Sequence, residues 1–156
     1  QQLAENSYVI VVPEATGVAS AVPKDTGPEP ILALLASANV AAGEKLAKKC
    51  TACHVFEAGG ANKVGPALWG VVNQAKASVD GFAYSAALAG FGGAWDYQSL
   101  NAFLAKPKAY ISGTKMNFAG LKKPEDRANM VAWMRTMSDS QVPLPTAEDI
   151  AAESGN

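Results

Sequence analysis

Two cysteines and the only histidine of the chain stand together in the stretch Cys50-Thr51-Ala52-Cys53-His54. Thiols three residues apart lie on one side of a helical turn, close enough to add across two vinyl groups on one porphyrin edge. The imidazole that follows could then bind the iron as its proximal ligand. Cys-x-x-Cys-His is the pattern of covalent attachment of a c-type haem. The sequence therefore predicts one covalent haem c, held by Cys50 and Cys53, with His54 on the iron.

Three other interpretations of these residues were weighed. A structural zinc site needs four N or S ligands, and the chain has no Cys or His beyond Cys50, Cys53 and His54. A thioredoxin-like redox pair would follow a strand, whereas the helix-like residues 41–49 precede Cys50. An ordinary disulfide, or two core thiols, would leave the adjacent histidine unexplained. Haem attachment accounts for all three side chains.

A second protein ligand to the iron cannot be histidine, so methionine is the natural candidate. Met130, Met134 and Met137 are spaced along one face of a predicted helix, which is typical of core residues. Met116 instead lies within residues 111–120, a loop that contains two glycines, where the backbone can aim a thioether. We expect Met116 to be the sixth ligand. The alternative is a loop methionine that fills a gap in the core.

Further short motifs follow one another in a fixed order between residues 39 and 138. They are Gly43, Cys50-Thr51-Ala52-Cys53-His54, Gly65-Pro66-Ala67-Leu68, Gly81-Phe82-Ala83-Tyr84, Trp95, Pro107-Lys108-Ala109-Tyr110, Gly113-Thr114-Lys115-Met116 and Phe118-Ala119-Gly120. In these motifs the chain resembles the class I cytochromes c, close to the mitochondrial and alphaproteobacterial electron carriers. The resemblance implies helices and long loops packed around one haem.

The resemblance also implies roles for residues around the haem. The Pro66 carbonyl would accept a hydrogen bond from His54 Nδ1, Tyr84 and Trp95 would hold a haem propionate, and Phe118 would line the haem pocket.

Two positions depart from the mitochondrial pattern. Gln74 stands where relatives often place an arginine near a propionate, and Phe103 stands where they have a tyrosine that reaches the Met sulfur. Both changes bear on the reduction potential, which hydrogen bonds and burial around the iron determine.

Helix signals recur through the same region and predict an all-α fold. Asn39 and Asp96 are good N-caps for helices over residues 40–49 and 97–106. A short helix is expected over residues 85–89, and the last helix begins with Pro124 and runs to about residue 138.

Two small residues bear on how the first and last of these helices meet. By resemblance, Gly43 lets the two helices approach closely. Ala47 replaces a larger residue of the relatives, while the last helix carries the large Trp133. We expect the large Trp133 side chain to fill the space that the small Ala47 leaves where the two helices cross.

The chain divides into three parts by composition. Residues 1–38 are a Pro/Ala-rich acidic extension or linker, residues 39–138 are the cytochrome c domain, and residues 139–156 are an acidic tail. No apolar run is long enough to span a bilayer, and no signal peptide pattern is visible. Because Gln1 is not an initiator, we expect a processed or trimmed N-terminus, from which a membrane tether was removed or is absent.

Charge is segregated along the chain. Between residues 41 and 137, twelve Lys and Arg stand against six Asp and Glu, a net +6, while residues 1–40 carry −3 and residues 138–156 carry −4. The acidic flanks either visit the basic face of the domain as flexible tethers or form ordered contacts.

Lysines around an exposed haem edge would steer the protein to acidic docking surfaces at salt-dependent rates. We expect Lys63, Lys115 and Lys122 to serve this purpose, because they flank the haem motif and the Met116 loop. Nucleic acid is not an expected partner, since no aromatic residues or reading helix lie among the charges.

Two functions follow from this reading. The first is a one-electron carrier, not an enzyme, whose implied donor is a cytochrome bc1 complex and whose implied acceptor is a terminal oxidase or a photosynthetic reaction centre. The second is a haem subunit fixed within a larger respiratory or dehydrogenase complex. Peroxidase or gas-sensing chemistry needs an open iron site, which Met116 would close. The expected location is the periplasm, with or without a membrane tether, or alternatively the mitochondrial intermembrane space.

Overall fold

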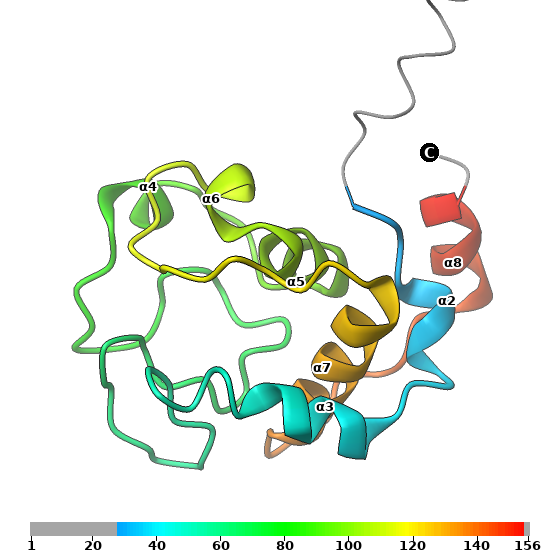
Figure 1. The fold of residues 1–156 in the computed structure, drawn as a ribbon, viewed down its shortest axis with the longest axis horizontal. Coiled ribbons are helices and arrows are strands. Elements are labelled where there is room, and N and C mark those ends of the chain that lie inside the picture. Colours follow the sequence, from blue (N-terminus) through cyan, green and yellow to red (C-terminus); the bar gives the residue numbers. More distant parts are fainter. Residues whose placement is uncertain (1–27, 155–156) are drawn as a thin grey trace, which may run out of the picture.

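The computed structural model describes residues 28–154, and in this part of the chain every regular element is a helix. The helices are α2 (Leu32–Leu35), α3 (Val40–Ala47), α4 (Ala86–Ala89), α5 (Tyr97–Ala105), α6 (Pro107–Tyr110), α7 (Pro124–Thr136) and α8 (Ala147–Ser154). Long loops join α3 to α4 and α6 to α7 (Figure 1). The predicted all-α class is confirmed.

Local signals set the ends of these helices. The Asn39 side chain accepts a hydrogen bond from the Ala42 N–H at 2.9 Å, and the Asp96 carboxylate accepts one from the Ser99 N–H at 2.8 Å. Pro124 occupies the first turn of α7, where its missing N–H costs no intrahelical bond. The predicted starts of α3, α5 and α7 are therefore confirmed.

The first and last helices of the cytochrome domain, α3 and α7, pack against each other (Figure 1). A Cβ added at Gly43 would lie 2.0 Å from the Asn129 carbonyl oxygen and 2.8 Å from the Trp133 Cβ. Only glycine fits at so close an approach, as the resemblance implied. On the same side of the core, Trp133 packs edge-on against Phe56, with ring centroids 4.7 Å apart.

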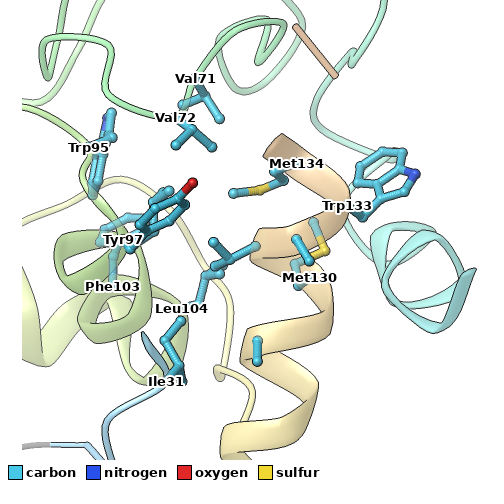
Figure 2. Packing of buried hydrophobic residues seen from close by; sticks show 14 of the residues in the cluster. Ile31, Val71, Val72, Trp95, Tyr97, Phe103, Leu104, Met130, Trp133 and Met134 are labelled. Carbon is cyan, nitrogen blue, oxygen red and sulfur yellow. The ribbon is translucent and has the colours of Figure 1, made fainter. Parts of the chain in front are cut away.

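One hydrophobic core joins α5, α7 and the loop that contains Val71 and Val72 (Figure 2). Met130 and Met134 are buried in it, as the sequence predicts. Met137, at the end of α7, is only half-buried but packs against the same cluster. The haem motif lies outside these helices, in the turns that follow α3.

The expectation that residues 1–38 form a linker does not hold for residues 28–38, while residues 1–27 lie outside the described part of the chain. Ile31, Leu32 and Leu35 are almost fully buried, at 0%, 2% and 3% exposure, and α2 packs against α7. The physical reason is that these aliphatic side chains find apolar partners in the core. The folded unit thus begins before residue 39.

The residues after 138 also pack on the domain. The Tyr97 hydroxyl donates to the carbonyls of Val142 and Pro143, and the Arg135 guanidinium donates to the Val142 carbonyl. The acidic helix α8 lies beside α2 (Figure 1), where a Glu153 oxygen accepts the Leu32 N–H at 2.9 Å. In the described residues, no helix has both the length and the apolar character needed to cross a bilayer.

Candidate functional site

The Cys-x-x-Cys-His stretch forms tight helical turns directly after α3. The Cys50 carbonyl accepts hydrogen bonds from the Cys53 N–H at 3.0 Å and from the His54 N–H at 2.9 Å. The Cys50 N–H in turn bonds to the Ala47 carbonyl at 2.8 Å. This winding places both thiols and the imidazole on consecutive turns of one short segment, the arrangement that covalent haem attachment requires.

A hydrogen bond holds one of the two ring nitrogens of His54 and would leave the other for a metal. Its Nδ1 lies 2.7 Å from the Pro66 carbonyl oxygen, as the resemblance implied. A carbonyl oxygen only accepts, so Nδ1 carries the hydrogen and Nε2 presents a lone pair. Burial is the main cause that lowers the pKa of His54, helped by the Lys63 charge and opposed by the Pro66 bond. The neutral imidazole that results is the form that ligates iron.

The loop opposite the histidine packs directly on its ring. A Cβ at Gly65 would lie 2.3 Å from His54 Cε1 and 2.7 Å from Nδ1. The Gly65 N–H also donates to the Cys53 carbonyl at 2.7 Å, and the Leu68 N–H donates to the Val55 carbonyl at 2.8 Å. The haem motif and the Gly65-Pro66 loop are therefore one rigid unit.

The two thiols are both free and half-buried. Burial, with the neighbouring Cys53 as the second cause, raises the pKa of the Cys50 thiol. A thioredoxin-type nucleophile has the opposite shift, because its function requires a thiolate near neutral pH. The raised pKa of Cys50 therefore argues against a redox nucleophile, and two thiols beside a fixed imidazole fit thioether formation with a porphyrin.

The Met116 loop is held by side chains that donate to backbone carbonyls. Lys108 Nζ donates to the carbonyl of the buried Thr114 at 3.1 Å, and Lys115 Nζ donates to the Ala83 carbonyl at 2.9 Å. The Met116 N–H lies 3.4 Å from the Thr114 hydroxyl. The Met116 side chain is half-buried and packs against the core.

The end of this loop is pinned to α5. Gly120 has a φ of +107°, and a Cβ there would lie 2.1 Å from the Ala105 carbonyl oxygen. The next N–H, that of Leu121, donates to the Leu104 carbonyl at 2.8 Å. Glycine is required here by both its backbone conformation and its contact.

The other residues expected at the haem lie in the following surroundings. The Tyr84 hydroxyl accepts the Val79 N–H at 2.9 Å. Trp95 is buried and packs against Phe103 with ring centroids 5.0 Å apart. Phe118 is half-buried against the core. Their contacts with a haem stay predictions.

The family model of cytochrome c matches residues 40–138. The chain belongs to the class I cytochromes c. It is 45% identical to a cytochrome c homolog of Bradyrhizobium diazoefficiens, over 87% of this chain and 80% of that protein. It is also 46% identical to the cytochrome c-type cyt cy of Rhodobacter capsulatus, over 60% of this chain and 46% of that protein. The solved structure of cytochrome cH from Methylobacterium extorquens superposes with a TM-score of 0.59 and 42% identity, covering 63% of this chain and 98% of that one.

Membership of the cytochrome c family decides between the interpretations of the cysteine motif. The protein is a haem-based electron carrier, and its haem c is attached covalently. Cys50 and Cys53 are the only cysteines of the chain, so they are the side chains available for this attachment. Bound haem supplies a one-electron couple between Fe(II) and Fe(III). The protein orients the His54 ring through the Pro66 carbonyl and the close contact with Gly65.

Arg127 and Lys76, two of the twelve cations between residues 41 and 137, make specific contacts within the fold. Arg127 is 1% exposed and makes hydrogen bonds inside the fold. Lys76 Nζ lies over the Trp95 ring, 4.9 Å from its centroid, and donates to the Ala94 carbonyl. In the sequence, Lys76 lies two residues after Gln74, and Gln74 is the position where the relatives often have an arginine.

The three lysines expected at the docking surface are all exposed. Lys63 Nζ donates to the Thr51 carbonyl at 2.7 Å, inside the haem motif, and Lys115 bonds to Ala83 as described above. Both cations are thus fixed to the backbone of neighbouring loops. Lys122 provides a carbonyl to Arg127 while its side chain is exposed.

Proposed function

We propose that this cytochrome carries single electrons with an iron that His54 and Met116 ligate in both oxidation states. The observation that carries the proposal is the His54 geometry, in which Nδ1 is bound to the Pro66 carbonyl and Nε2 is left to bind a metal. The same tautomer and orientation recur in proteins wherever a carbonyl fixes a metal-binding histidine.

The case for Met116 rests on its loop. Among the methionines, Met130 and Met134 are buried in the core between helices, at 1% and 3% exposure, and Met137 ends α7. Met116 lies in a loop that Lys108, Lys115 and Thr114 fix through hydrogen bonds. A thioether presented by such a loop can ligate iron without a change in its helices, and a His/Met pair favours a high reduction potential.

Electrons would enter and leave while the carrier is docked to membrane complexes. We propose a cytochrome bc1 complex as the donor and a terminal oxidase or a photosynthetic reaction centre as the acceptor. The exposed Lys63, Lys115 and Lys122 would meet acidic surfaces on these partners and raise association rates at low salt. We place the protein in the periplasm, because its relatives include alphaproteobacterial cytochromes c.

The alternative, a haem subunit fixed within a larger complex, also has a specific observation in its favour. Chain on both sides of residues 39–138 folds onto the domain. Helix α2 packs against α7 and α8, and the Tyr97 hydroxyl on α5 donates to the carbonyls of Val142 and Pro143. Such additions could present a permanent interface.

One experiment tests the carrier and separates it from the fixed subunit. The purified holoprotein is added to a purified bc1 complex and a terminal oxidase in liposomes, and electron flow is followed as its concentration is raised. A diffusing carrier gives flow that rises with concentration and falls with salt. No restored flow, together with co-sedimentation of the protein with one complex in stoichiometric amounts, would favour the fixed subunit instead.

A further inference from the structure

Arg127 is a buried cation on α7. Its side chain is 1% exposed, and every polar nitrogen of its guanidinium has a partner. Nε donates to Asn101 Oδ1 at 2.6 Å, a neutral acceptor on α5. A buried guanidinium is costly unless it is both hydrogen-bonded and matched by a negative charge. The identity of the counter-charge is therefore important for this region.

One side of the guanidinium holds the chain that follows the Met116 loop. Nη1 donates to the Leu121 carbonyl at 2.8 Å and to the Lys122 carbonyl at 2.9 Å. Leu121 is also the residue whose N–H bonds to the Leu104 carbonyl. Arg127 and Leu104 thus fix the chain five residues after Met116, and with it the end of the loop that presents the thioether.

The other side of the guanidinium meets a carboxylate from outside the family-matched domain. Nη2 donates to Glu29 Oε1 at 2.9 Å and to the Glu29 carbonyl at 3.3 Å. Among residues 28–154, this is the one salt bridge that the structure contains. The Glu29 side chain is 64% exposed, so water reaches it. Asn101 Nδ2 donates to the same Glu29 carbonyl at 2.9 Å, which fixes the backbone of the extension as well.

The extension at this point runs beside the Met116 loop. Pro28, Glu29, Ala119, Lys122 and Arg127 line one groove, together with residues of α5 and α6. The start of the described chain and the loop that carries the proposed sixth ligand are therefore neighbours in space, although 98 residues separate Glu29 from Arg127 in sequence.

We propose that Glu29 is a positioning residue for Met116, acting through Arg127 on the Leu121 and Lys122 carbonyls. With the carboxylate present, the guanidinium is neutralised and holds the end of the loop in place. With the carboxylate removed, or with the extension pulled away from the domain, Arg127 loses its counter-charge and the loop opens more often. The N-terminal extension thus regulates how firmly the sixth ligand stays on the iron. The inference rests on the proposed ligation by Met116.

The test compares the holoprotein with three variants. Glu29→Gln removes the charge and keeps the shape, and Glu29→Ala removes both. Glu125→Gln is the matched control, because Glu125 is an exposed acid in the first turn of the same helix as Arg127 and has no salt bridge among the described residues. Two quantities are measured: the hydrogen exchange rate of the Leu121 amide by NMR, and the pH at which the ferric protein loses the weak absorption band of Met–iron ligation.

We expect both Glu29 variants to exchange the Leu121 amide roughly three- to tenfold faster than the wild type, which is the order of effect of losing one charge-assisted hydrogen bond at a partly exposed site. We also expect them to lose the Met–iron band at a lower pH, with Glu125→Gln unchanged in both measurements. If the Glu29 variants match the control while the wild type shows the Met–iron band, the inference is wrong and the proposed ligation stands. If the wild type lacks that band, the ligation and the inference fail together.

Discussion

The imidazole of His54 and the backbone of Gly65 are in van der Waals contact, so that a single Cβ at position 65 would lie 2.3 Å from the ring. The contact ties the side chain of the proximal ligand to the loop that carries its hydrogen-bond acceptor, Pro66. Glycine at position 65 is therefore required by the contact with the His54 ring.

We expect Gly65→Ala to displace His54 from the Pro66 carbonyl and to destabilise the holoprotein by about 1–3 kcal/mol, the usual cost of overpacking. Denaturant unfolding and the NMR signals of the His54 ring would measure this. Gly90→Ala is the control, because a Cβ there would meet only the Ala86 carbonyl oxygen at 3.4 Å and the backbone φ is −94°. Equal stability of the two variants, with an unchanged His54 ring, would contradict the account.

Trp133 tests the packing of α7 against α3. The indole is 8% exposed and packs against Phe56, and its Cβ lies close to Gly43 on α3. We expect Trp133→Ala to lower the free energy of unfolding by about 3–5 kcal/mol, because neighbouring side chains cannot fill the cavity. Leu144→Ala, at a position 39% exposed, should cost less than about 1 kcal/mol. A similar loss in both variants would show that the crossing is not specially dependent on this indole.

Substitution of the three docking lysines should change the rate of association with a partner. Replacing Lys63, Lys115 and Lys122 by Gln should slow association with an acidic partner, by roughly tenfold at low salt, and flatten its salt dependence. Gln keeps a donor near the Thr51 and Ala83 carbonyls that Lys63 and Lys115 bind. Stopped-flow kinetics over a range of ionic strength measures both effects. Lys45→Gln in α3 and Lys48→Gln directly after it are the controls, compared per charge removed. An unchanged slope would place docking on another surface.

The contribution of Glu29 to the free energy of unfolding should depend on pH. A hydrogen bond from its own backbone N–H, and then the Arg127 guanidinium, hold the pKa of this carboxyl below its ordinary value. A depressed pKa stabilises the fold above the pKa of the unfolded chain, and the stabilisation is lost as the pH falls through the folded pKa. The difference in unfolding free energy between wild type and Glu29→Gln should thus be constant near neutral pH and shrink below about pH 4. A difference that persists in acid would mean that the negative charge of Glu29 does not stabilise the fold.

Local signals predicted much of this fold. Asn39 and Asp96 mark helix starts through side chains that need only the next few residues, and the cysteine motif is read from five consecutive positions. A local signal of the same kind starts α8, where Thr146 and Asp149 exchange hydrogen bonds as a capping box.

What the sequence could not predict depends on contacts between distant residues. Glu153 meets the Leu32 N–H across 121 positions, and Glu29 meets Arg127 across 98. No periodicity marks such pairs. Arg127 is an example, because only its distant polar partners allow this cation to be buried. The short α2 was likewise hidden by flanking prolines, because burial in the core and not helix propensity keeps it folded.

Replacement of Met116 tests the central claim most directly. The thioethers to Cys50 and Cys53 do not depend on the sixth ligand, so Met116→Ala should retain covalent haem after denaturation while its native ferric spectrum loses the Met–iron band. Its reduction potential should fall, because a thioether favours the reduced iron. Met137→Ala, a half-buried methionine at the end of α7, should keep both the band and the potential. A Met116→Ala protein that retains the Met–iron band at an unchanged potential would contradict the assignment of the site.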